Sequence, residues 1–524
     1  MSNHYSRREI IGAIAAGAVY AAWPGRVRAA TSGGLLIRDV QLIDGTGAPR
    51  RSTDVRVSGD TIEAIGRFPA ESARGMRVVE GGGRILAPGF IDVHGHGDPL
   101  ERSYVSFLAM GATTVVLGQD GGSPRLRDSK DANAGLPAWM DAIDRATPDI
   151  NVATLTGHGS LRRLARIDDA TRRPSADELD RMAALLEADL RAGSHGLSTG
   201  LEYIPGRYAE TRELTGLGAV VARYHGVSMS HMRSEDEGLI RESIEELIAS
   251  SLPARPHISH LKVMYGKGEA QAQALLEFLH AKRRAGVDLT ADAYPYTAGY
   301  TGVAILFPEW ALPPTDYEEV LETRRDELRD HLERRMIRRG GPEALLFGSD
   351  PYAGKTVAQA AAEARKAFPD FLVDIGPRGG SGAHFTMDEA LQRRLLLDPI
   401  VAIATDGAPG MRHPRSTGTY AKWIEEFVVA QRRLPLEEAI RKATSLPASI
   451  MRFADRGVIR PGAKADLVLF DPSRVRARSD YVDPFAWSEG FDLVVVNGQP
   501  AFESGERVGA AGRLLRRGGA SNAG

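Results

Sequence analysis

Eight short apolar runs, each ending at or near a polar residue, recur through the middle of this 524-residue chain. The runs are APGFIDVH, TTVVLGQD, NVATLTGH, SHGLSTGL, GVSMSH, PHISHLKV, VDLTADAY and PIVAIATD. Amphipathic stretches such as ADELDRMAALLEADLRAG and EAQAQALLEFLHAKRRAG separate them, and each ends near a glycine, as helices tend to do. Strand and helix alternating eight times predict an α/β fold, specifically a (β/α)8 barrel of the TIM type.

The spacing of these runs shows one irregularity. Strand ends from His94 to Asp292 follow one another at roughly 25 to 45 residues, the ordinary length of a strand–helix unit in this fold. The next interval, from Asp292 to Asp406, is 114 residues. A bare loop of that length is unusual in a compact domain, so we expect an insertion with its own helices at about 307–385, between barrel strands 7 and 8. The charged run DYEEVLETRRDELRDHLERRMIRR inside it predicts a solvated helix, and a partner-binding helix is the alternative.

Both flanks of the predicted barrel, residues 88–455, have the pattern of β structure. In 31–87 and again in 456–512, short apolar runs alternate with Gly, Asp and Asn turn residues. We expect the two segments to fold together as one small β-sandwich. The final residues, 513–524, which include RRGGASNAG, are predicted to be a disordered tail.

The first residues, 1–30, predict export from the cytoplasm. Arg7 and Arg8 precede a small, apolar stretch, and Val27-Arg28-Ala29-Ala30 is similar to a small-residue cleavage site. The segment resembles a twin-arginine signal peptide, which implies a periplasmic protein without stable membrane insertion after cleavage. The alternative is a membrane anchor, but an apolar stretch of ~14 residues is too short to span a bilayer.

Composition narrows the chemistry. The chain has 66 basic and 68 acidic residues and a net charge of -2, so no overall basic field favours nucleic acid as a partner. It has no cysteine, which excludes disulfides, thiolate zinc sites, iron–sulfur clusters and cysteine nucleophiles. Any metal must therefore be bound by histidine and carboxylate side chains.

Four of the thirteen histidines fall at or near predicted strand ends: His94, His96, His231 and His260. In a barrel, the carboxyl ends of the strands form the active-site face. His94 and His96 are two residues apart, so both can face the same side of a strand and bind one ion. The pair alone is weak evidence for a metal site, but the apolar run before it and the backbone room left by Gly95 strengthen the prediction.

Two aspartates also end apolar runs. A buried strand that ends in a carboxylate, as at Asp406, is costly unless the charge meets a metal or a proton-transfer task, and a helix N-cap is the alternative. Asp120 ends the second run in the same manner, or is a turn residue before two glycines. In the sixth run His260 shares a face with Lys262, so we expect His260 to reach the centre and His257 to pack.

A histidine pair after strand one, single histidines after strands five and six, and an aspartate after strand eight resemble the amidohydrolase superfamily. Longer stretches are similar to the N-acyl-D-amino-acid deacylases, or D-aminoacylases: GFIDVHGHGD, GLSTGLEYIPG, SHMRSE, HISHLK, DAYPYTAG, and TDG with HPRSTGTYAKW. The similarity continues in RGVIRPGAKADLVLFDP and VVVNGQ, so it covers nearly all of the mature chain. It implies a zinc-dependent enzyme that hydrolyses the amide bond of N-acyl-D-amino acids, small-molecule substrates, to a carboxylate and a free D-amino acid.

The resemblance also implies roles for individual residues. His231 and His260 become ligands of a tightly held zinc, while His94, His96 and Asp406 surround a second, often weaker, metal position. Asp406 is also the expected catalytic acid and base.

The chain departs from the family pattern at one ligand position, where better-known members have a cysteine in a Gly-Asn-Cys-Gly stretch. Here the stretch is Gly118-Gln119-Asp120-Gly121. Asp120 can replace the thiolate as a bridging oxygen ligand, and this harder ligand set suits one or two ions of Zn²⁺, Co²⁺ or Mn²⁺.

The family-matched candidates for binding the substrate's α-carboxylate are Arg415, Lys262 and Tyr294, and arginine suits a two-point grip on a carboxylate. Tyr203 is a further pocket candidate, with packing as the alternative. Related enzymes continue DAYPYTAG with Ser-Thr, whereas this chain has Tyr300 at the first of these positions. The preferred side chain and acyl group therefore do not transfer from the family.

Two other functions stay open. One is hydrolysis of a cyclic amide or a dipeptide, as in hydantoinase-like or isoaspartyl-dipeptidase-like relatives, although no lysine lies at a strand end to bridge two metals. The other is an exported metal-binding protein without catalysis, against which Asp406 argues because a structural site needs no acid/base carboxylate. The sequence leaves the oligomeric state open.

Overall fold

The computed structural model describes residues 34–126 and 135–518. The predicted export signal, 1–30, lies outside the described residues. Within the two described ranges, none of the helices combines the length and the apolar character needed to cross a bilayer.

Each of the eight apolar runs contains parallel strand structure, and the third run is divided into two short strands at Leu155. The α/β class expected from the alternation is therefore confirmed. The parallel strands of the described part of the chain are β6 (Phe90–Asp92), β7 (Ala112–Leu117), β8 (Asn151–Thr154), β9 (Thr156–Gly157), β10 (Gly196–Gly200), β11 (Val227–His231), β12 (Arg255–Ile258), β13 (Thr290–Ala293) and β17 (Val401–Ile403).

The order of these strands brings their carboxyl ends to one place. One sheet runs β6-β7-β8, and another runs β9-β10-β11-β12-β13-β17. Just beyond the last and first strands, the amide of Asp406 donates to the carbonyl of His94 and the amide of His96 donates to the carbonyl of Gly407, both at 2.8 Å. Residues that end the first and the last strand of the series are thus direct neighbours.

Helices follow the parallel strands, as the amphipathic stretches predict. The helix Ala176–Ala192 shows why: Ser175 caps its start, Met182, Leu186 and Leu190 lie four residues apart on a buried face, and Gly193 ends it with a φ of 114°. The helices associated with the parallel strands are α1 (Val105–Ala109), α2 (Leu136–Arg145), α3 (His158–Leu164), α4 (Ala176–Ala192), α5 (Thr211–Arg223), α6 (Ile240–Ser251), α7 (Gly268–Arg284), α12 (Glu389–Leu396), α13 (Arg415–Lys422), α14 (Leu436–Ala443) and α15 (Ser445–Met451), and a π-helix, η6 (Trp423–Ala430), continues α13. Short 3₁₀ helices are η1 (Ala70–Ala73), η2 (Gly206–Tyr208), η3 (Val303–Leu306), η4 (Glu309–Ala311) and η5 (Pro342–Ala344).

The two flanks of the chain share one sheet, which has nine strands in the described residues. Its centre is the antiparallel pairing of a C-terminal strand with an N-terminal one, in which Leu467 lies opposite Pro88 and Phe470 opposite Ile85. Buried Leu, Ile and Val side chains from both flanks form its core. The strands are β1 (Leu35–Leu42), β2 (Arg51–Ser58), β3 (Thr61–Gly66), β4 (Arg77–Glu80), β5 (Ile85–Pro88), β18 (Leu467–Phe470), β19 (Phe491–Val496), β20 (Gln499–Glu503) and β21 (Glu506–Arg507).

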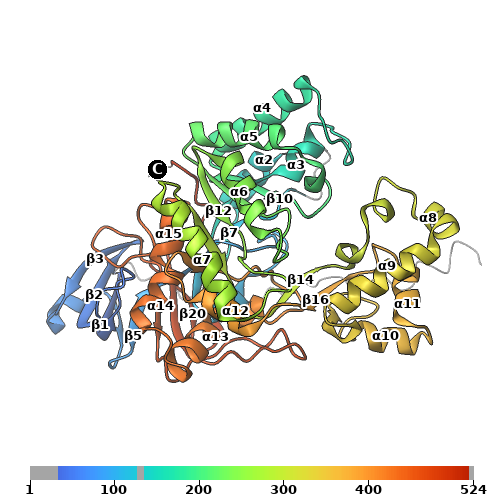
Figure 1. Cartoon of the computed structure of the whole chain (residues 1–524). Helices are drawn as coiled ribbons and strands as arrows, with labels where there is room; N and C mark the ends of the chain where they lie inside the picture. Colours follow the sequence, from blue (N-terminus) through green and yellow to red (C-terminus); the bar gives the residue numbers. More distant parts are fainter. Residues whose placement is uncertain (1–33, 127–134, 519–524) are drawn as a thin grey trace, which may run out of the picture. The chain divides into compact units, whose positions relative to one another are not determined.

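The long interval before β17 holds a small antiparallel sheet, four helices and a hydrophobic core of its own (Figure 1). It opens at residue 298, before the predicted 307, because its first strand pairs with its last. The elements are β14 (Ala298–Gly302), β15 (Leu345–Phe347), β16 (Ser381–Phe385), α8 (Tyr317–Thr323), α9 (Arg325–Arg338), α10 (Val357–Glu363) and α11 (Phe368–Ile375). We call residues 298–385 the insertion.

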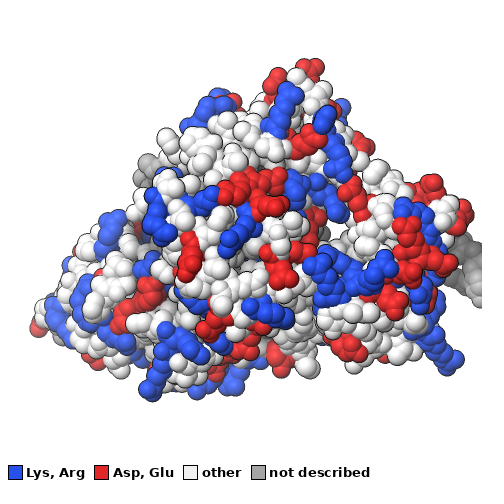
Figure 2. Space-filling view, viewed as in Figure 1, with Lys and Arg blue, Asp and Glu red and all other residues white. Residues whose placement is uncertain are grey.

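The charged run of the insertion forms α8 and α9. One face of α9 is buried in the insertion core, through Leu328, Leu332 and Met336. Its outer face carries ion pairs such as Arg329 with Glu333. Basic and acidic side chains are interspersed over the whole face of the molecule shown in Figure 2, in keeping with the near-zero net charge.

The end of the chain differs from the prediction of a disordered tail beginning at 513. The amide of Val152 donates to the carbonyl of Arg513, the amide of Leu515 donates to the carbonyl of Val152, and the amide of Arg517 donates to the carbonyl of Gly193, at 2.7 to 2.9 Å. Composition suggested disorder, but the backbone here finds partners on β8 and at the end of α4. Residues 519–524 lie outside the described residues.

Candidate metal centre

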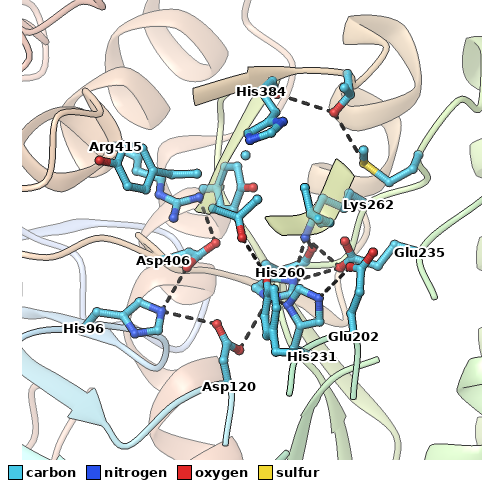
Figure 3. A pocket seen from close by; sticks show the side chains of 18 of the residues that line it. His96, Asp120, Glu202, His231, Glu235, His260, Lys262, His384, Asp406 and Arg415 are labelled. Carbon is cyan, nitrogen blue, oxygen red and sulfur yellow. Dashed lines mark hydrogen bonds and ion pairs between the residues drawn. The ribbon is translucent and has the colours of Figure 1, made fainter. Parts of the chain in front are cut away.

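All six predicted metal ligands meet at the carboxyl ends of the parallel strands (Figure 3). Their ligand atoms fall into two groups, in each of which the atoms lie within 4.8 Å of one another. One group contains the two histidines of the first strand end and Asp406. The other contains the histidine that ends β11 and the histidine within the sixth run, and Asp120 belongs to both. The groups are His94, His96, Asp120 and Asp406, and Asp120, His231 and His260.

The separations within the centre suit an ion. Asp120 oxygens lie 3.5 Å from Nε2 of His94, 3.4 Å from Nε2 of His96 and 3.5 Å from Nε2 of His260. Oδ1 of Asp406 lies 3.1 Å from Nε2 of His96 and 3.7 Å from Nε2 of His94. A tetrahedral zinc ion with bonds of about 2.0 to 2.1 Å separates its ligand atoms by about 3.4 Å. These side chains therefore have the spacing of a ligand shell without large rearrangement.

Two ligand atoms of this centre have unmet bonding capacity. Nε2 of His94 and Oδ1 of Asp120 are buried and have no hydrogen-bond partner among the described residues. A buried polar atom without a partner is costly, whereas a cation between the two satisfies both. The imidazole and carboxylate donors, with no thiolate, therefore fit a divalent ion such as zinc.

Three carboxylates that the sequence argument missed hold the ligand histidines from outside. Each contacts the ring nitrogen that faces away from the ligand cluster, as metal-ligating histidines in proteins usually require. This contact fixes the orientation of the ring and directs the other nitrogen inward. The pairs are His94 Nδ1 with Asp292 at 3.4 Å, His231 Nε2 with Glu202 at 3.0 Å, and His260 Nδ1 with Glu235 at 3.0 Å.

The sequence contained a signal for these carboxylates. Asp292 ends an apolar run just as Asp120 and Asp406 do, and Glu202 comes two residues after β10. Asp292 also accepts a hydrogen bond from His257, at 2.8 Å. His257 is fully buried and packs outside the ligand cluster, in agreement with its predicted role.

The backbone of the centre is locally unusual. Asp120, His260 and Asp406 all adopt positive φ angles, of 51°, 37° and 48°. Residues other than glycine rarely adopt this left-handed region, and such positions concentrate at functional sites. Between the histidines of the first strand end, a Cβ on Gly95 would lie 2.3 Å from Cγ2 of Val115. Only glycine fits there without displacing β7.

The charges of the centre favour a bound cation. Burial would raise the pKa of Asp406, but Arg415 and the hydrogen bond to His96 outweigh it and hold that pKa well below its ordinary range. Burial and Lys262 lower the pKa of His260, but Glu235 and Asp120 outweigh them and raise it to about 9. The carboxylates therefore stabilise positive charge here, which an imidazolium or a divalent cation supplies.

The ligand cluster opens into a cavity of about 320 Å³, within the usual range for small-molecule sites. All four predicted substrate-binding residues line it: Tyr203, Lys262, Tyr294 and Arg415. Arg415 lies over the ring of Tyr294, 4.8 Å from its centroid, and the Tyr294 hydroxyl has no hydrogen-bond partner among the described residues. Nζ of Lys262 is 2.7 Å from Glu235. Two cations and a free hydroxyl thus face the same space as the ligands (Figure 3).

Comparisons with known proteins agree with this geometry. Residues 378–502 match a family model described as Amidohydrolase family. An N-acyl-D-glutamate deacylase from Alcaligenes xylosoxydans xylosoxydans is 34% identical over 503 residues, covering 92% of this chain and 96% of that protein. A D-aminoacylase from the same organism is 31% identical over 512 residues, covering 92% and 97%.

A solved structure is also similar over nearly the whole chain. It is an N-acyl-D-glutamate deacylase from Bordetella bronchiseptica, complexed with zinc and a phosphonate inhibitor that mimics the tetrahedral intermediate of the reaction. It is 33% identical, has a TM-score of 0.79, and the alignment covers 92% of this chain and 99% of that one. Together with the ligand cluster, these similarities show that the chain belongs to the N-acyl-D-amino-acid deacylase, or D-aminoacylase, family of amidohydrolases.

Proposed function

We propose that this protein hydrolyses the amide bond of N-acyl-D-amino acids and releases a carboxylate and a free D-amino acid. The observation that carries the proposal is the position of Asp406, whose carboxylate lies between the histidine cluster and Arg415 in a single cavity. The named relatives, deacylases of N-acyl-D-amino acids, support the same reaction.

The proposed cofactor is zinc, as one or two ions, with Co²⁺ or Mn²⁺ as alternatives that suit the same oxygen and nitrogen donors. When bound, zinc lowers the pKa of a water molecule and polarises the carbonyl of the substrate. The proposed ligands of the tighter position are His231, His260 and Asp120, and those of the second position are His94, His96, Asp120 and Asp406.

The bridging role proposed for Asp120 has its own test. Asp120→Ala removes the one carboxylate that both ligand groups share, so we expect the purified variant to lose metal as measured by elemental analysis, and activity with it. Asp288→Asn, which changes an exposed aspartate paired with Arg255, is the control. Unchanged metal content and activity in Asp120→Ala would contradict the proposed ligand set.

Side chains of the protein are proposed to carry out proton transfer and substrate binding. Oδ1 of Asp406 faces the histidines and is the atom proposed to take a proton from the attacking water and deliver it to the departing nitrogen, while Oδ2 is held by Arg415. Arg415, Lys262 and Tyr294 are proposed to bind the α-carboxylate, which orients the scissile amide toward the ligand cluster. Tyr203, 4.4 Å from the ring of His231 between centroids, walls the cavity beside them.

The test measures amine release by the zinc-supplemented protein from matched N-acetyl-D- and N-acetyl-L-amino acids with Met, Leu, Phe, Glu and Asp side chains. We expect turnover of D forms only, lost with a chelator and restored with zinc. Turnover of hydantoins or dipeptides instead would favour a cyclic amide hydrolase or dipeptidase. Absence of all turnover by a folded, metal-loaded protein would favour a binding protein without catalysis.

We further infer that the parallel strands close into a (β/α)8 barrel of residues 88–455. The hydrogen bonds between the ends of β6 and β17 support this arrangement. The nine-stranded sheet would then be a β-sandwich of residues 31–87 and 456–512, and the insertion, residues 298–385, would lie between barrel strands 7 and 8.

Export to the periplasm through a twin-arginine signal remains a proposal carried by the sequence of residues 1–30. Fractionation of cells that express the full chain tests it. The wild type is expected in the periplasm, whereas replacement of Arg7 and Arg8 by Lys is expected to retain the protein in the cytoplasm. An unchanged location in the variant would contradict the proposal.

A further inference from the structure

The insertion contributes a buried arginine to the cavity that holds the ligand cluster. Arg339 follows α9 directly, with its amide hydrogen-bonded to the carbonyl of Arg335. Its side chain lines the cavity, although the residue is only 5% exposed. His384, on β16 of the insertion, lines the cavity next to it.

This arginine forms no ion pair within the part of the chain that the structure describes. No carboxylate oxygen lies within 4.0 Å of its guanidinium, and its buried Nε has no hydrogen-bond partner. Its Nη2 lies 3.5 Å from Nδ1 of His384. A guanidinium is always charged, and burying one without an anion is costly. The cavity therefore presents an anion-binding group that the protein itself does not satisfy.

The neighbouring charged groups do not fill this gap. Asp236 lines the same cavity and interacts electrostatically with Arg339, but its ion pair is with Arg338, at 3.9 Å. Arg338 also lies over the ring of Tyr265. Burial and Arg339 hold the pKa of His384 well below its ordinary value, so that imidazole is neutral. A neutral His384 can accept from the guanidinium and position it, but it cannot balance its charge.

The position of this group differs from that of the α-carboxylate clamp. Arg415 and Lys262 come from the barrel end, beside the ligand histidines, whereas Arg339 and His384 come from the insertion. In Figure 3, His384 lies at the opposite side of the cavity from Asp120, with Asp406 and His260 between them. A ligand whose α-carboxylate meets Arg415 thus has a second cation within reach of another part of the same molecule.

We propose that Arg339 binds a second carboxylate of the substrate, so that the preferred N-acyl-D-amino acid is a dicarboxylate. The second carboxylate belongs either to an acidic side chain, as in D-glutamate or D-aspartate, or to a dicarboxylic acyl group such as succinyl. Arginine grips a carboxylate through two parallel N–H donors. The inference rests on the proposed deacylase function and assigns the preference to the insertion.

The first experiment compares kcat/KM for N-acetyl-D-glutamate and N-acetyl-D-glutamine, which differ only in charge at the side-chain end. A hydrogen-bonded charge contributes about 10- to 100-fold, so we expect that preference for the glutamate substrate. Arg339→Met keeps the length of the side chain, removes the charge, and is expected to reduce the preference to less than about threefold. Arg334→Met, on the exposed side of α9, is the matched control and is expected to behave as the wild type.

The second experiment tests the acyl group as the source of the carboxylate. It compares N-succinyl-D-norleucine with N-succinamoyl-D-norleucine in the same three proteins. A charge preference in one substrate pair that disappears in Arg339→Met identifies the source and supports the proposal. Equal rates within both pairs of wild-type enzyme, or an undiminished preference in Arg339→Met, would overturn it.

Two controls keep these outcomes separable. Thermal unfolding of Arg339→Met shows whether the variant folds. If it does not, the rates of the wild-type enzyme within each substrate pair still test whether the preferred substrate is a dicarboxylate. Failure to hydrolyse any N-acyl-D-amino acid would overturn the proposed function. Hydrolysis of the neutral and charged substrates at equal rates would overturn only the role of Arg339.

Discussion

The guanidinium of Arg415 forms an ion pair with the carboxylate of Asp406, with Nη1 of Arg415 2.8 Å from Oδ2 of Asp406. Both side chains are buried, and the other carboxylate oxygen faces His96. One oxygen of Asp406 is therefore held by a cation while the other is directed at the ligand cluster. A substrate carboxylate that enters this part of the cavity meets an arginine that is already fixed in place.

Removing this guanidinium should weaken the binding of substrates that carry an α-carboxylate. For Arg415→Met we expect kcat/KM for N-acetyl-D-amino acids to fall about 10- to 100-fold more than for the corresponding α-carboxamides, which lack the charge. Steady-state kinetics on matched acid and amide substrates measures the difference. Arg412→Met, beside it in sequence and stacked over Phe485, is the control. An equal loss for acid and amide would show that Arg415 acts only on Asp406.

Removing the proposed acid and base should affect rate far more than folding. Asp406→Asn is nearly isosteric, and we expect kcat to fall at least about 100- to 10,000-fold, the usual contribution of general acid–base catalysis. Metal analysis of the purified variant separates loss of proton transfer from loss of a ligand. Near-normal kcat in a metal-loaded variant would exclude Asp406 from the proton transfer.

The outer carboxylates should tune metal affinity. Glu202→Gln removes the charge that orients His231, so the dissociation constant for zinc should rise about 10- to 100-fold, the usual effect of such a partner. Competition with a chromophoric chelator measures it. Glu210→Gln, which changes a surface residue paired with Arg173, should leave the constant unchanged. Equal affinities in the two variants would contradict the orienting role.

The close approach at Gly95 should make that position intolerant of a side chain. We expect Gly95→Ala to lower the free energy of unfolding by about 1 to 3 kcal/mol, because its Cβ would overlap Val115. Denaturant titration measures the loss, and Val115→Ala in the same chain should restore part of it. Gly216→Ala, on α5 with nothing within 4 Å of the new Cβ, should be neutral or slightly stabilising. An unchanged free energy of unfolding in Gly95→Ala would contradict the close approach of Gly95 to Val115.

A buried carboxyl on α4 should make stability depend on pH. Burial raises the pKa of Asp189 from 3.8 to about 7, against a hydrogen bond from Thr156 that lowers it. The unfolded chain therefore ionises this group from about pH 4 while the folded chain retains its proton, so its contribution to stability falls as pH rises from about 4 to 7. One pKa unit corresponds to about 1.4 kcal/mol, so the full effect is on the order of 4 kcal/mol.

Asp189→Asn should remove this dependence. The melting temperature of the variant relative to wild type should therefore rise between pH 5 and pH 8, with the gain complete above pH 7. Thermal melts of both proteins across this range measure the difference. Asp180→Asn, on the same helix and exposed, is the control. A constant difference in melting temperature across the range would show that Asp189 does not titrate in this way.

The residues of the proposed ligand cluster could be singled out from the sequence because most of them stand at or near the end of an apolar run. His94 and Asp406 come just after β6 and β17, His231 is the last residue of β11, and the residues of all three strands are buried. Buried strands leave little freedom in register, so alternation indicates which side chains face the centre. Asp292 obeys the same rule and was missed only because its partner, His94, is distant in sequence. The carboxylate–histidine contacts depend on how neighbouring strands are aligned, which no single run encodes.

Arg339 could not have been predicted in the same way. It lies at the end of a run dense in charges, and such a run predicts a solvated helix. Its burial results from the packing of α9 on the insertion core and from the position of β16, whose residues are separated from it by more than forty positions. The pattern of acidic and basic residues does not indicate that this arginine is buried while its neighbours are exposed. Likewise, the glycine-rich end of the chain concealed backbone pairing with β8.

The hydrogen bonds between the ends of β6 and β17 affect when the centre can form during synthesis of the chain. They join His94 to Asp406 and His96 to Gly407, residues more than 300 positions apart in the sequence. The complete ligand set therefore does not exist on a growing chain until synthesis has passed Asp406 and the last strand has docked beside the first. Binding of an ion by the whole proposed ligand set would therefore be a late event. An ion bound in this way would join the two ends of the strand series and oppose their separation.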